Sequence, residues 1–437
     1  MRATTPPAAA QPRVSSQQDR QRATPVRLAF WGNFGTLNLG NECTLAAALH
    51  NARRLLPNAE LLSVCSNPAD TRLRHGIDAI AIAAGGADFD SGQRSGLAHL
   101  WARARAILAD WPRVLRSVSR FDALLITGTG IVTDIGEGPF GMPFQLFKWA
   151  VATRLRGRQL LFVSVGAEAI HHPLSRFFLK TALRLARYRG YRDEHSVAVV
   201  RAAGLALQGD VVCPDLAFSL PQPLIAAAAP APERVSGGRP PVAVGLFNYR
   251  RSGRGGPVSA EYSAYVDTVC ALILWLHGRG HPVRVIIGDL AYDEPVRLDV
   301  RARLEQRGFN LSGGNFVDEP AGSFEQLLLQ LRTVELVIAS RFHNVLLSLF
   351  LGIPVVSVSY ESKNDDLMRQ MGLGGYCQSL DGLNAERLRE QFLDLESRAA
   401  EVRAQLEVRS RANRSRLEHQ YRRMLEVVGV PGPQAAP

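Results

Sequence analysis

The stretch ELVIASRFHNVLLSLFLGIPVVSVSY, residues 335 to 360, carries the pattern that decides the fold. A short apolar run, ELVIAS, is followed by the helical stretch NVLLSLFLG and then by a second apolar run, PVVSVSY. Two strands joined by a helix are typical of a parallel pair, because parallel neighbours need a crossover connection. We therefore predict an α/β unit around this stretch.

The same alternation of apolar runs and helical stretches extends in both directions along the chain. Upstream in the second half it appears as PVAVGLFN, AYVDTVCALILWLHGRG, PVRVIIGD and FEQLLLQLR. In the first half it appears as VRLAFWG, ECTLAAALHNARRLL, AELLSVC, FDALLITG, FQLFKWAVATRLRG and QLLFVSVG. The fold class that this pattern predicts is α/β, with two Rossmann-like domains facing a cleft in a GT-B-like arrangement.

A Pro/Ala/Gly-rich stretch between the two halves predicts a linker. We expect an N-terminal Rossmann-like domain on the acceptor side, a C-terminal one on the donor side, and leucine-spaced surface helices after them that fold back across the domains. The expected boundaries are 1–25 for a disordered tail, 26–220 for the first domain, 221–241 for the linker, 242–378 for the second domain and 379–437 for the terminal helices and tail.

Composition supports this organisation and limits the classes of function. The chain has 437 residues, 46% of them hydrophobic, whereas single cores stop growing near about 250 to 300 residues. No apolar run approaches the roughly 18 residues of a membrane span, and no signal-peptide pattern occurs, so we expect a cytoplasmic protein. Five cysteines without metal-ligand spacing argue against a zinc site or a disulfide framework. The net charge of +11 favours anionic partners without choosing among phosphorylated substrates, lipid headgroups and nucleic acid.

The turn after ELVIAS holds the most informative side chains. Arg341 and His343 lie at the start of a helix, where the helix dipole adds to the positive potential and favours an anion. His343 could bind a phosphate or transfer a proton, although a lone histidine is as often a satisfied structural residue. Lys363, just beyond the strand that ends at Tyr360, either adds a charge to the cleft or is a solvated loop lysine.

Three stretches of the first half also follow strands. GNFGTLNLGNECTL and TGTGIVTD are small-residue turns that either approach a ligand closely or simply need unusual backbone angles. In YRDEHS, Asp193 is most simply a helix N-cap, and Arg192 either binds an anion or pairs with a neighbouring carboxylate. In CPDLAF, a hinge hydrogen bond explains Asp215 as well as catalysis does. The candidate substrate-binding residues of the two turns are Gly35, Asn38, Gly40, Asn41, Gly128, Thr129 and Gly130.

Taken in order, these stretches resemble the polysaccharide pyruvyl transferase family from Val26 to Leu373. The shared features are the Gly-Asn-containing first turn, GTGIVTD, YRDEHS, PDLAF, SRFHN and GIPVVSVSYESK. The resemblance implies a GT-B-like fold, phosphoenolpyruvate as the donor substrate with no further cofactor or metal, and a sugar acceptor whose two hydroxyls form a pyruvate ketal. By carry-over, Arg192, Arg341 and His343 hold the donor's anionic groups or assist proton transfer.

The chain departs from the family pattern in the first half. Asn41 stands where the family usually has aspartate, and Thr129 stands where it often has a third glycine. Asparagine keeps a hydrogen-bond acceptor but loses the charge, while threonine adds bulk. Acceptor use is therefore where this chain is expected to differ.

Two other functions compete with this interpretation. A GT-B glycosyltransferase that uses a nucleotide sugar would share the architecture and the basic cleft. A non-enzymatic binder of nucleic acid or of an anionic surface would use the positive charge, but the arginines are dispersed and no nucleic-acid motif occurs, so we expect no nucleic-acid partner. The acceptor sugar is expected in a polysaccharide or lipid-linked precursor, with room for peripheral contact at the inner face of the membrane. The sequence leaves the oligomeric state undetermined.

Overall fold

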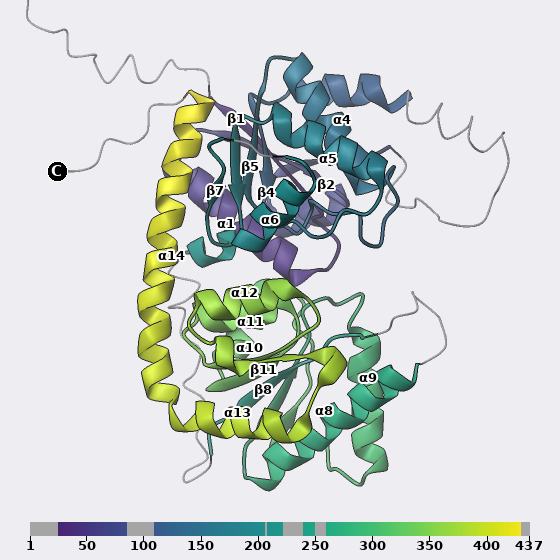
Figure 1. The fold of residues 1–437 in the computed structure, drawn as a ribbon, viewed down its shortest axis with the longest axis vertical. Helices are drawn as coiled ribbons and strands as arrows, with labels where there is room; N and C mark the ends of the chain where they lie inside the picture. The colour runs from purple at the N-terminus through teal and green to yellow at the C-terminus, as the bar shows by residue number, and fades with distance from the viewer. Residues whose placement is uncertain (1–24, 85–108, 206–207, 222–238, 250–258, 430–437) are drawn as a thin grey trace, which may run out of the picture.

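The computed structural model describes residues 25–84, 109–205, 208–221, 239–249 and 259–429. Most of the expected N-terminal tail, 1–24, and most of the expected linker, 222–238, lie outside the described residues. Within these ranges, the chain forms two lobes stacked along the long axis of the molecule (Figure 1). No helix among the described residues is long and apolar enough to cross a membrane.

The first lobe is built on a seven-stranded sheet in which every neighbouring pair is parallel. From edge to edge its strands are β3 (Asp78–Ala81), β2 (Glu60–Cys65), β1 (Arg27–Gly32), β4 (Ala123–Thr127), β5 (Gln159–Val165), β6 (Tyr188–Tyr191) and β7 (Val211–Val212). Its helical segments include α1 (Leu39–Leu55), α2 (Pro68–His75), α4 (Met142–Leu155), α5 (Pro173–Leu185), α6 (Glu194–Ala202) and the 3-10 turn η2 (Leu216–Ser219).

The second lobe repeats the plan with a six-stranded parallel sheet. Its strands are β10 (Phe316–Val317), β9 (Val283–Ile286), β8 (Val242–Gly245), β11 (Leu336–Ala339), β12 (Val355–Ser359) and β13 (Cys377–Ser379). Its helical segments are α8 (Ala260–Gly278), α9 (Glu294–Gln306), α10 (Phe324–Leu331), α11 (Phe342–Phe350), α12 (Ser362–Gln370), η3 (Gly374–Tyr376), η4 (Leu380–Gly382) and α13 (Ala385–Ser397).

The central strands are buried on both faces, which explains why they read as continuous apolar runs rather than as alternating ones. Every residue of β4, β8, β11 and β12 is buried. The predicted α/β class with two Rossmann-like domains is confirmed. The apolar pattern did not reveal the short strands β3, β10 and β13 or the polar helices α2 and α9, because these elements bury few large side chains.

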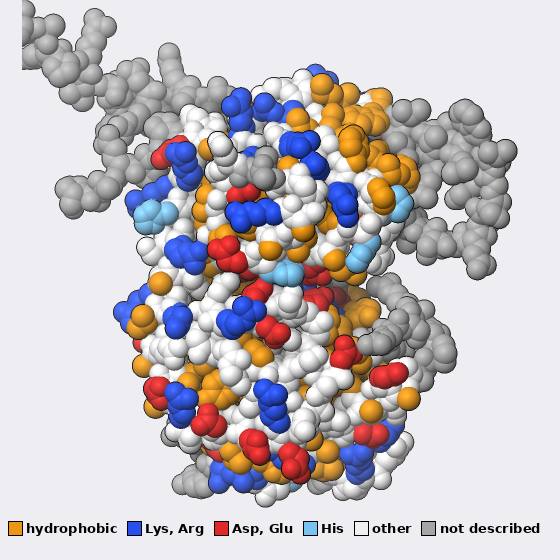
Figure 2. Space-filling view, viewed as in Figure 1, with side chains coloured by type: hydrophobic (Ala, Val, Ile, Leu, Met, Phe, Trp, Pro, Cys, Tyr) orange, Lys and Arg blue, Asp and Glu red, His pale blue; other side chains and the backbone are white. Residues whose placement is uncertain are grey.

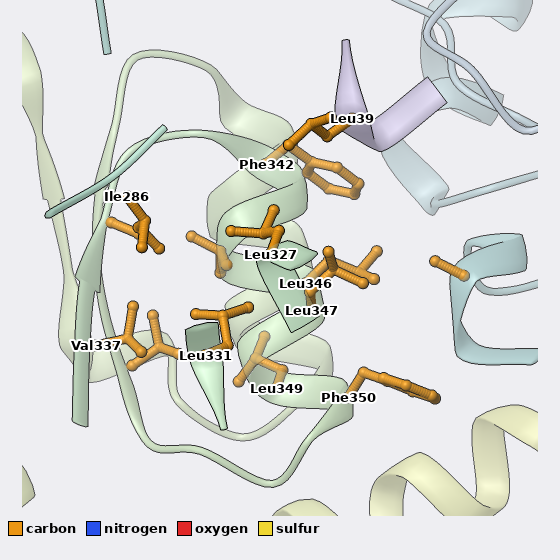
Figure 3. Packing of buried hydrophobic residues seen from close by; sticks show 14 of the residues in the cluster. Leu39, Ile286, Leu327, Leu331, Val337, Phe342, Leu346, Leu347, Leu349 and Phe350 are labelled. Carbon is orange, nitrogen blue, oxygen red and sulfur yellow. The ribbon is translucent and has the colours of Figure 1, made fainter. Parts of the chain in front are cut away.

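The two lobes meet through the start of α1 and the helices α10 and α11, which share one apolar core. Leu39 of α1 lies beside Phe342 of α11, next to the leucines of α10 and α11 (Figure 3). Backbone hydrogen bonds join the lobes at the same place: Leu39 donates to the Gly288 carbonyl over 3.0 Å, and Leu290 donates to the Leu37 carbonyl over 3.1 Å. The lobes are thus docked where strand ends of both sheets converge.

A single long helix, α14 (Ala399–Val428), runs along both lobes (Figure 1). Its first half contacts the second lobe, where Arg403 bonds Glu335 over 3.1 Å. Its second half returns to the first lobe, where the buried Gln420 donates to the Ser164 hydroxyl over 2.8 Å and accepts from the Tyr188 hydroxyl over 3.1 Å. The helix therefore ties its two ends to different sheets.

Gln420→Ala is expected to destabilise the fold by about 2 kcal/mol or more, because an unsatisfied buried polar group costs about 1 to 3 kcal/mol and this change leaves two hydroxyls without their partner. Thermal unfolding and urea unfolding measure the effect. Glu407→Ala, at an exposed position of the same helix, is the control. Equal stability of the two variants would show that α14 does not hold the first lobe through Gln420.

Candidate functional site

Arg341 ends the loop after β11 and is held in a forked ion pair inside the second lobe. Its Nε and Nη2 donate to the two carboxylate oxygens of the fully buried Asp293, over 2.8 and 2.6 Å. The guanidinium also stacks 4.5 Å from the ring centre of Phe247, which lies parallel to the Tyr360 ring at 3.9 Å. Burial acts against the charge of Arg341, but Asp293 outweighs it and raises the arginine pKa. Among the described residues, Nη1 makes no hydrogen bond.

His343, on the first turn of α11, touches the first lobe directly. An ideal Cβ added to Gly40 would lie 2.0 Å from Nδ1 of His343, so only glycine fits where α1 begins. The Nε2 atom of His343 is buried and makes no hydrogen bond within the described structure. Burial, followed by the charges of Arg192, Lys363 and Arg341, lowers the pKa of His343 to about 3. The imidazole is therefore neutral at pH 7 in the free protein.

Arg192 follows β6 and brings a positive charge from the first lobe to the same place. Its guanidinium lies 4.3 Å from the ring centre of Phe342, the neighbour of His343. Behind it stand two buried carboxylates: Asp193 accepts from Nε over 3.3 Å, and Asp215 lies 3.8 Å from Nη1. Asp193 is also the N-cap of α6, as the sequence predicts, and Asp215 caps η2. Of the two alternatives considered for Arg192, the structure shows the pairing with a neighbouring carboxylate, Asp193, and anion binding stays a prediction.

Asp215 is unusual among these carboxylates. Its Oδ2 has no hydrogen-bond donor within the described residues, and its side chain is buried. Burial raises the pKa of Asp215 to about 6, although Arg192 acts in the opposite direction. The Asp215 carboxylate therefore lies beside Arg192 although its burial disfavours the charged form.

Lys363 reaches from the start of α12 across to the first lobe. Its Nζ donates to Glu168 over 3.0 Å and also pairs with Glu361. Burial works to lower the pKa of Lys363, but the carboxylates of Glu361 and Glu168 outweigh it and raise the pKa above its usual value. Lys363 is thus directed into the junction rather than solvated as a loop lysine.

The glycine-rich turn after β4 lies beside the pair of Lys363 and Glu168. The Gly128 backbone has φ 22°, and a Cβ there would meet Thr44 at 2.6 Å. Gly130 is exposed, and a Cβ on it would lie 3.8 Å from Oε1 of Glu168. The Thr129 side chain is buried, with no hydrogen-bond partner for its hydroxyl among the described residues. The bulk that threonine adds is therefore directed into the lobe.

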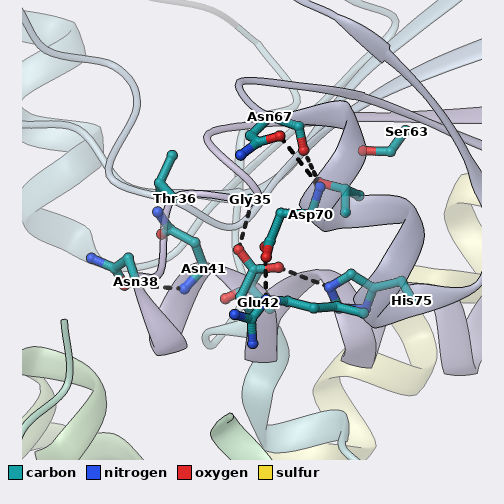
Figure 4. Close-up of polar contacts among 12 residues, drawn as sticks. Gly35, Thr36, Asn38, Asn41, Glu42, Ser63, Asn67, Asp70 and His75 are labelled. Atoms are coloured by element: carbon teal, nitrogen blue, oxygen red, sulfur yellow. Dashed lines mark hydrogen bonds and ion pairs between the residues drawn. The ribbon is translucent and has the colours of Figure 1, made fainter. Parts of the chain in front are cut away.

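The turn before α1 holds the helix start in place. Asn38 caps α1 through Gly40 and Asn41 and donates to Asp289 of the second lobe over 3.2 Å. Gly35, with φ 75°, donates to the buried Glu42 over 2.8 Å. Figure 4 shows Glu42 between this turn and His75. Oε2 of Glu42 lies 2.8 Å from Nε2 of His75. Gly35 therefore shapes the turn, and Asn38 joins the two lobes through Asp289.

Asn41 belongs to the same turn. Its side-chain amide donates to the Asn33 carbonyl over 3.0 Å, and the residue is partly exposed. This hydrogen bond holds the asparagine against the loop that follows β1. An aspartate at position 41 could not donate it.

The structure thus brings together residues from both lobes that the sequence singled out separately. We call His343, Arg192, Arg341, Lys363 and Glu168 the junction cluster. Glu168 was not among the residues predicted from the sequence, although it follows the strand QLLFVSVG by two residues and so lies at the same sheet edge as the other candidates. Asp293 was not predicted either, and nothing near it in the sequence distinguishes it. In the described part of the chain, no group of three or more His, Cys, Asp or Glu residues could hold a metal ion.

Solved structures with the same fold are enzymes that act on sugars or sugar nucleotides. The UDP-GlcNAc 2-epimerase from Neisseria meningitidis, solved with UDP-GlcNAc, has a TM-score of 0.57 at 10% identity, covering 92% of this chain and 99% of that one. A glycosyltransferase from Rickettsia africae has a TM-score of 0.57 at 10% identity, with coverages of 93% and 98%. At this identity the likeness establishes the GT-B fold alone.

Sequence comparison is more specific. No curated protein matches the chain. The family model described as polysaccharide pyruvyl transferase matches residues 38–362, a range that begins at the cap of α1 and ends at the start of α12, and so contains every member of the junction cluster except Lys363, which follows directly. On this match, which spans most of the sequence, the chain belongs to the polysaccharide pyruvyl transferase family.

Proposed function

We propose that this protein transfers pyruvate from phosphoenolpyruvate to two hydroxyls of a sugar, in a polysaccharide or lipid-linked precursor, as a ketal. The observation that carries the proposal is the neutral imidazole of His343, held among three cations where the two sheets meet. Phosphoenolpyruvate carries a carboxylate and a phosphate, so it suits this set of cations. No further cofactor is needed for the reaction as proposed.

Donor binding changes the charge around His343. In the free protein, Arg192, Lys363 and Arg341 all act to lower its pKa. The anionic groups of phosphoenolpyruvate offset these charges and raise the pKa, because a nearby negative charge favours the imidazolium. Donor binding thereby allows His343 to take up the proton that the reaction consumes. When the donor is absent, the same histidine carries little charge.

The chemical steps then balance. Protonated His343 gives its proton to the methylene carbon of the donor, which becomes a methyl group and leaves the neighbouring carbon electrophilic. One sugar hydroxyl adds to that carbon, the phosphate leaves with the bonding electron pair, and the second hydroxyl closes the ketal. Of the two hydroxyl protons, one restores His343 and the other leaves with the phosphate. Glu168, beside Gly130, is suited to accept a hydroxyl proton once the donor has drawn Lys363 away.

Incubation with phosphoenolpyruvate and a panel of sugar acceptors tests the proposal directly, with phosphate release and acceptor mass as readouts. A thermal-shift comparison separates it from the nucleotide-sugar alternative, because a ligand that binds the folded state raises the unfolding temperature. Stabilisation by phosphoenolpyruvate and not by UDP is expected. Stabilisation by UDP alone would favour a glycosyltransferase.

Arg341→Lys is expected to weaken phosphoenolpyruvate binding by roughly tenfold, since an ammonium keeps the charge but cannot pair with both oxygens of Asp293 and also offer an N–H to the donor in the place of Nη1. Arg341→Ala should weaken it further and also lower the unfolding temperature, because Asp293 would be left buried without its partner. Isothermal titration calorimetry measures both affinities. The control is Arg303→Lys, which alters the surface pair with Asp267. Unchanged donor affinity in a folded Arg341→Lys protein contradicts the assignment.

His343→Gln is expected to remove a proton uptake of about one per bound donor, because the histidine is neutral before binding and charged after it. Calorimetry in buffers of different ionisation enthalpy measures the uptake. Turnover should fall by about a hundredfold or more as the proton donor is lost. If wild type and variant take up the same number of protons, His343 does not protonate on binding.

The same variant also tests the burial of His343 in the free protein. A histidine that titrates near 3 when folded and about 6.5 when unfolded favours the folded state above pH 6.5, and this advantage shrinks as the pH falls toward 3. Between pH 7.5 and pH 5, His343 should account for a loss of about 2 kcal/mol in unfolding free energy. Urea unfolding at the two pH values should show a correspondingly smaller loss in His343→Gln.

Gly40→Ala is expected to lower turnover by about a hundredfold, because the added methyl forces His343 to move and small displacements of reacting groups cost that much. Steady-state kinetics and donor titration measure it. Gly138→Ala, where a Cβ meets nothing within 4 Å, should behave as wild type. Normal turnover in Gly40→Ala would mean that the position of His343 does not matter to the reaction.

A further inference from the structure

Outside the junction cluster, the first lobe exposes an apolar surface over α4 and α5. Phe177 is 57% exposed and Leu174 is 43% exposed, both on α5, and Ile135, in the loop between β4 and α4, is 53% exposed. Figure 2 shows hydrophobic side chains gathered at the upper right, where Figure 1 places these helices. We call Ile135, Phe140, Phe147, Leu174 and Phe177 the α4–α5 patch.

Aromatic rings that pack against one another in tilted or edge-on contacts make this surface continuous and hold its side chains in place. Phe147 and Phe177 lie 6.1 Å apart between ring centres, and Phe177 lies 5.8 Å from the buried Phe178. Phe140 packs 6.0 Å from Phe178 and 5.9 Å from the buried Phe144. The exposed rings are therefore held in place by rings beneath them. Large apolar side chains gathered in this way on a surface indicate a binding face.

The charge around the patch is mostly positive. Residues 134–187 contain eight lysines and arginines and three acidic residues: Asp134, which is buried, Glu137, which is exposed, and Glu168, which pairs with Lys363. Lys148 is also used internally, in a buried pair with Asp110. The exposed basic side chains of this segment are Arg156, Arg176, Arg184 and Arg187. The patch thus combines apolar side chains with a basic rim.

The patch lies at the end of the sheet that carries the junction cluster. The loop that leaves β4 passes through Gly130, beside Glu168, and then through Ile135 to reach α4. Asp134 fixes this loop to the start of α5 by accepting hydrogen bonds from the backbones of His171 and His172, over 2.9 and 2.8 Å. The loop that passes beside Glu168 of the junction cluster therefore leads directly into the patch.

We propose that the α4–α5 patch docks the protein on a membrane surface that contains anionic lipids. Aromatic and leucine side chains insert at the headgroup level, while each nearby lysine or arginine adds electrostatic attraction to an anionic leaflet. A second copy of the chain fits this face less well, because the patch would meet its own basic rim. If the proposed function holds, docking here favours an acceptor sugar that is carried on a lipid.

Cosedimentation of the full chain with phosphatidylglycerol vesicles tests the surface without either substrate. Binding to these vesicles, weaker binding at high salt and no binding to phosphatidylcholine vesicles are expected. The double variant Leu174→Ser with Phe177→Ser should lower the vesicle affinity by roughly tenfold or more, through the loss of inserted apolar area. The matched control replaces Leu73 and Val408, exposed apolar residues elsewhere, with serine and should bind as wild type.

A second double variant, Arg176→Gln with Arg184→Gln, keeps the apolar residues and should weaken binding by reducing the charge. Failure of the wild type to bind phosphatidylglycerol vesicles overturns the proposal, as does equal binding by wild type and the serine variant of the patch. A dimer of the wild type that the patch variant dissociates would instead identify an interface between copies. Stabilisation by phosphoenolpyruvate should persist in every variant, so a failure here is distinguishable from a failure of the donor site.

Discussion

The site depends on the contact between Gly40 of the first lobe and His343 of the second lobe. A side chain at position 40 would occupy the space of the imidazole. With glycine there, α1 begins directly against α11, so the positive ends of two helix dipoles meet at one point. The backbone bonds of Leu39 and Leu290 with the opposite lobe hold this approach in place. The other residues of the cluster are arranged around it.

Buried charges at this junction are held in pairs, which decides how the cluster behaves. Arg341 is matched by Asp293, Arg192 by Asp193 and Asp215, and Lys363 by Glu168. Removing one member of a buried pair costs more than the pair contributes, because the remaining charge is left desolvated. The cations are therefore prepositioned. Burial, followed by the charges of these three cations, lowers the pKa of His343.

The helix α14 sets how the lobes can move. It contacts both lobes, with Arg403 at one end and Gln420 at the other. A separation must bend this helix or release one of its ends. The ion pair between Lys363 and Glu168 spans the lobes and has to break in the same movement.

The sequence by itself determined the α/β class, the two Rossmann-like domains and the strand ends that carry Arg192, Arg341 and His343, because alternating apolar runs and capping residues are local signals. Asp193 as an N-cap was readable for the same reason. Only the tertiary structure decided that Arg341 pairs with Asp293, 48 residues away, and that Lys363 pairs with Glu168, 195 residues away. The position of Gly40 against His343, and with it the lowered pKa of the histidine, likewise comes from the docking of two lobes. Burial and neighbouring charge depend on distances in space, and a pattern along one chain does not specify those distances.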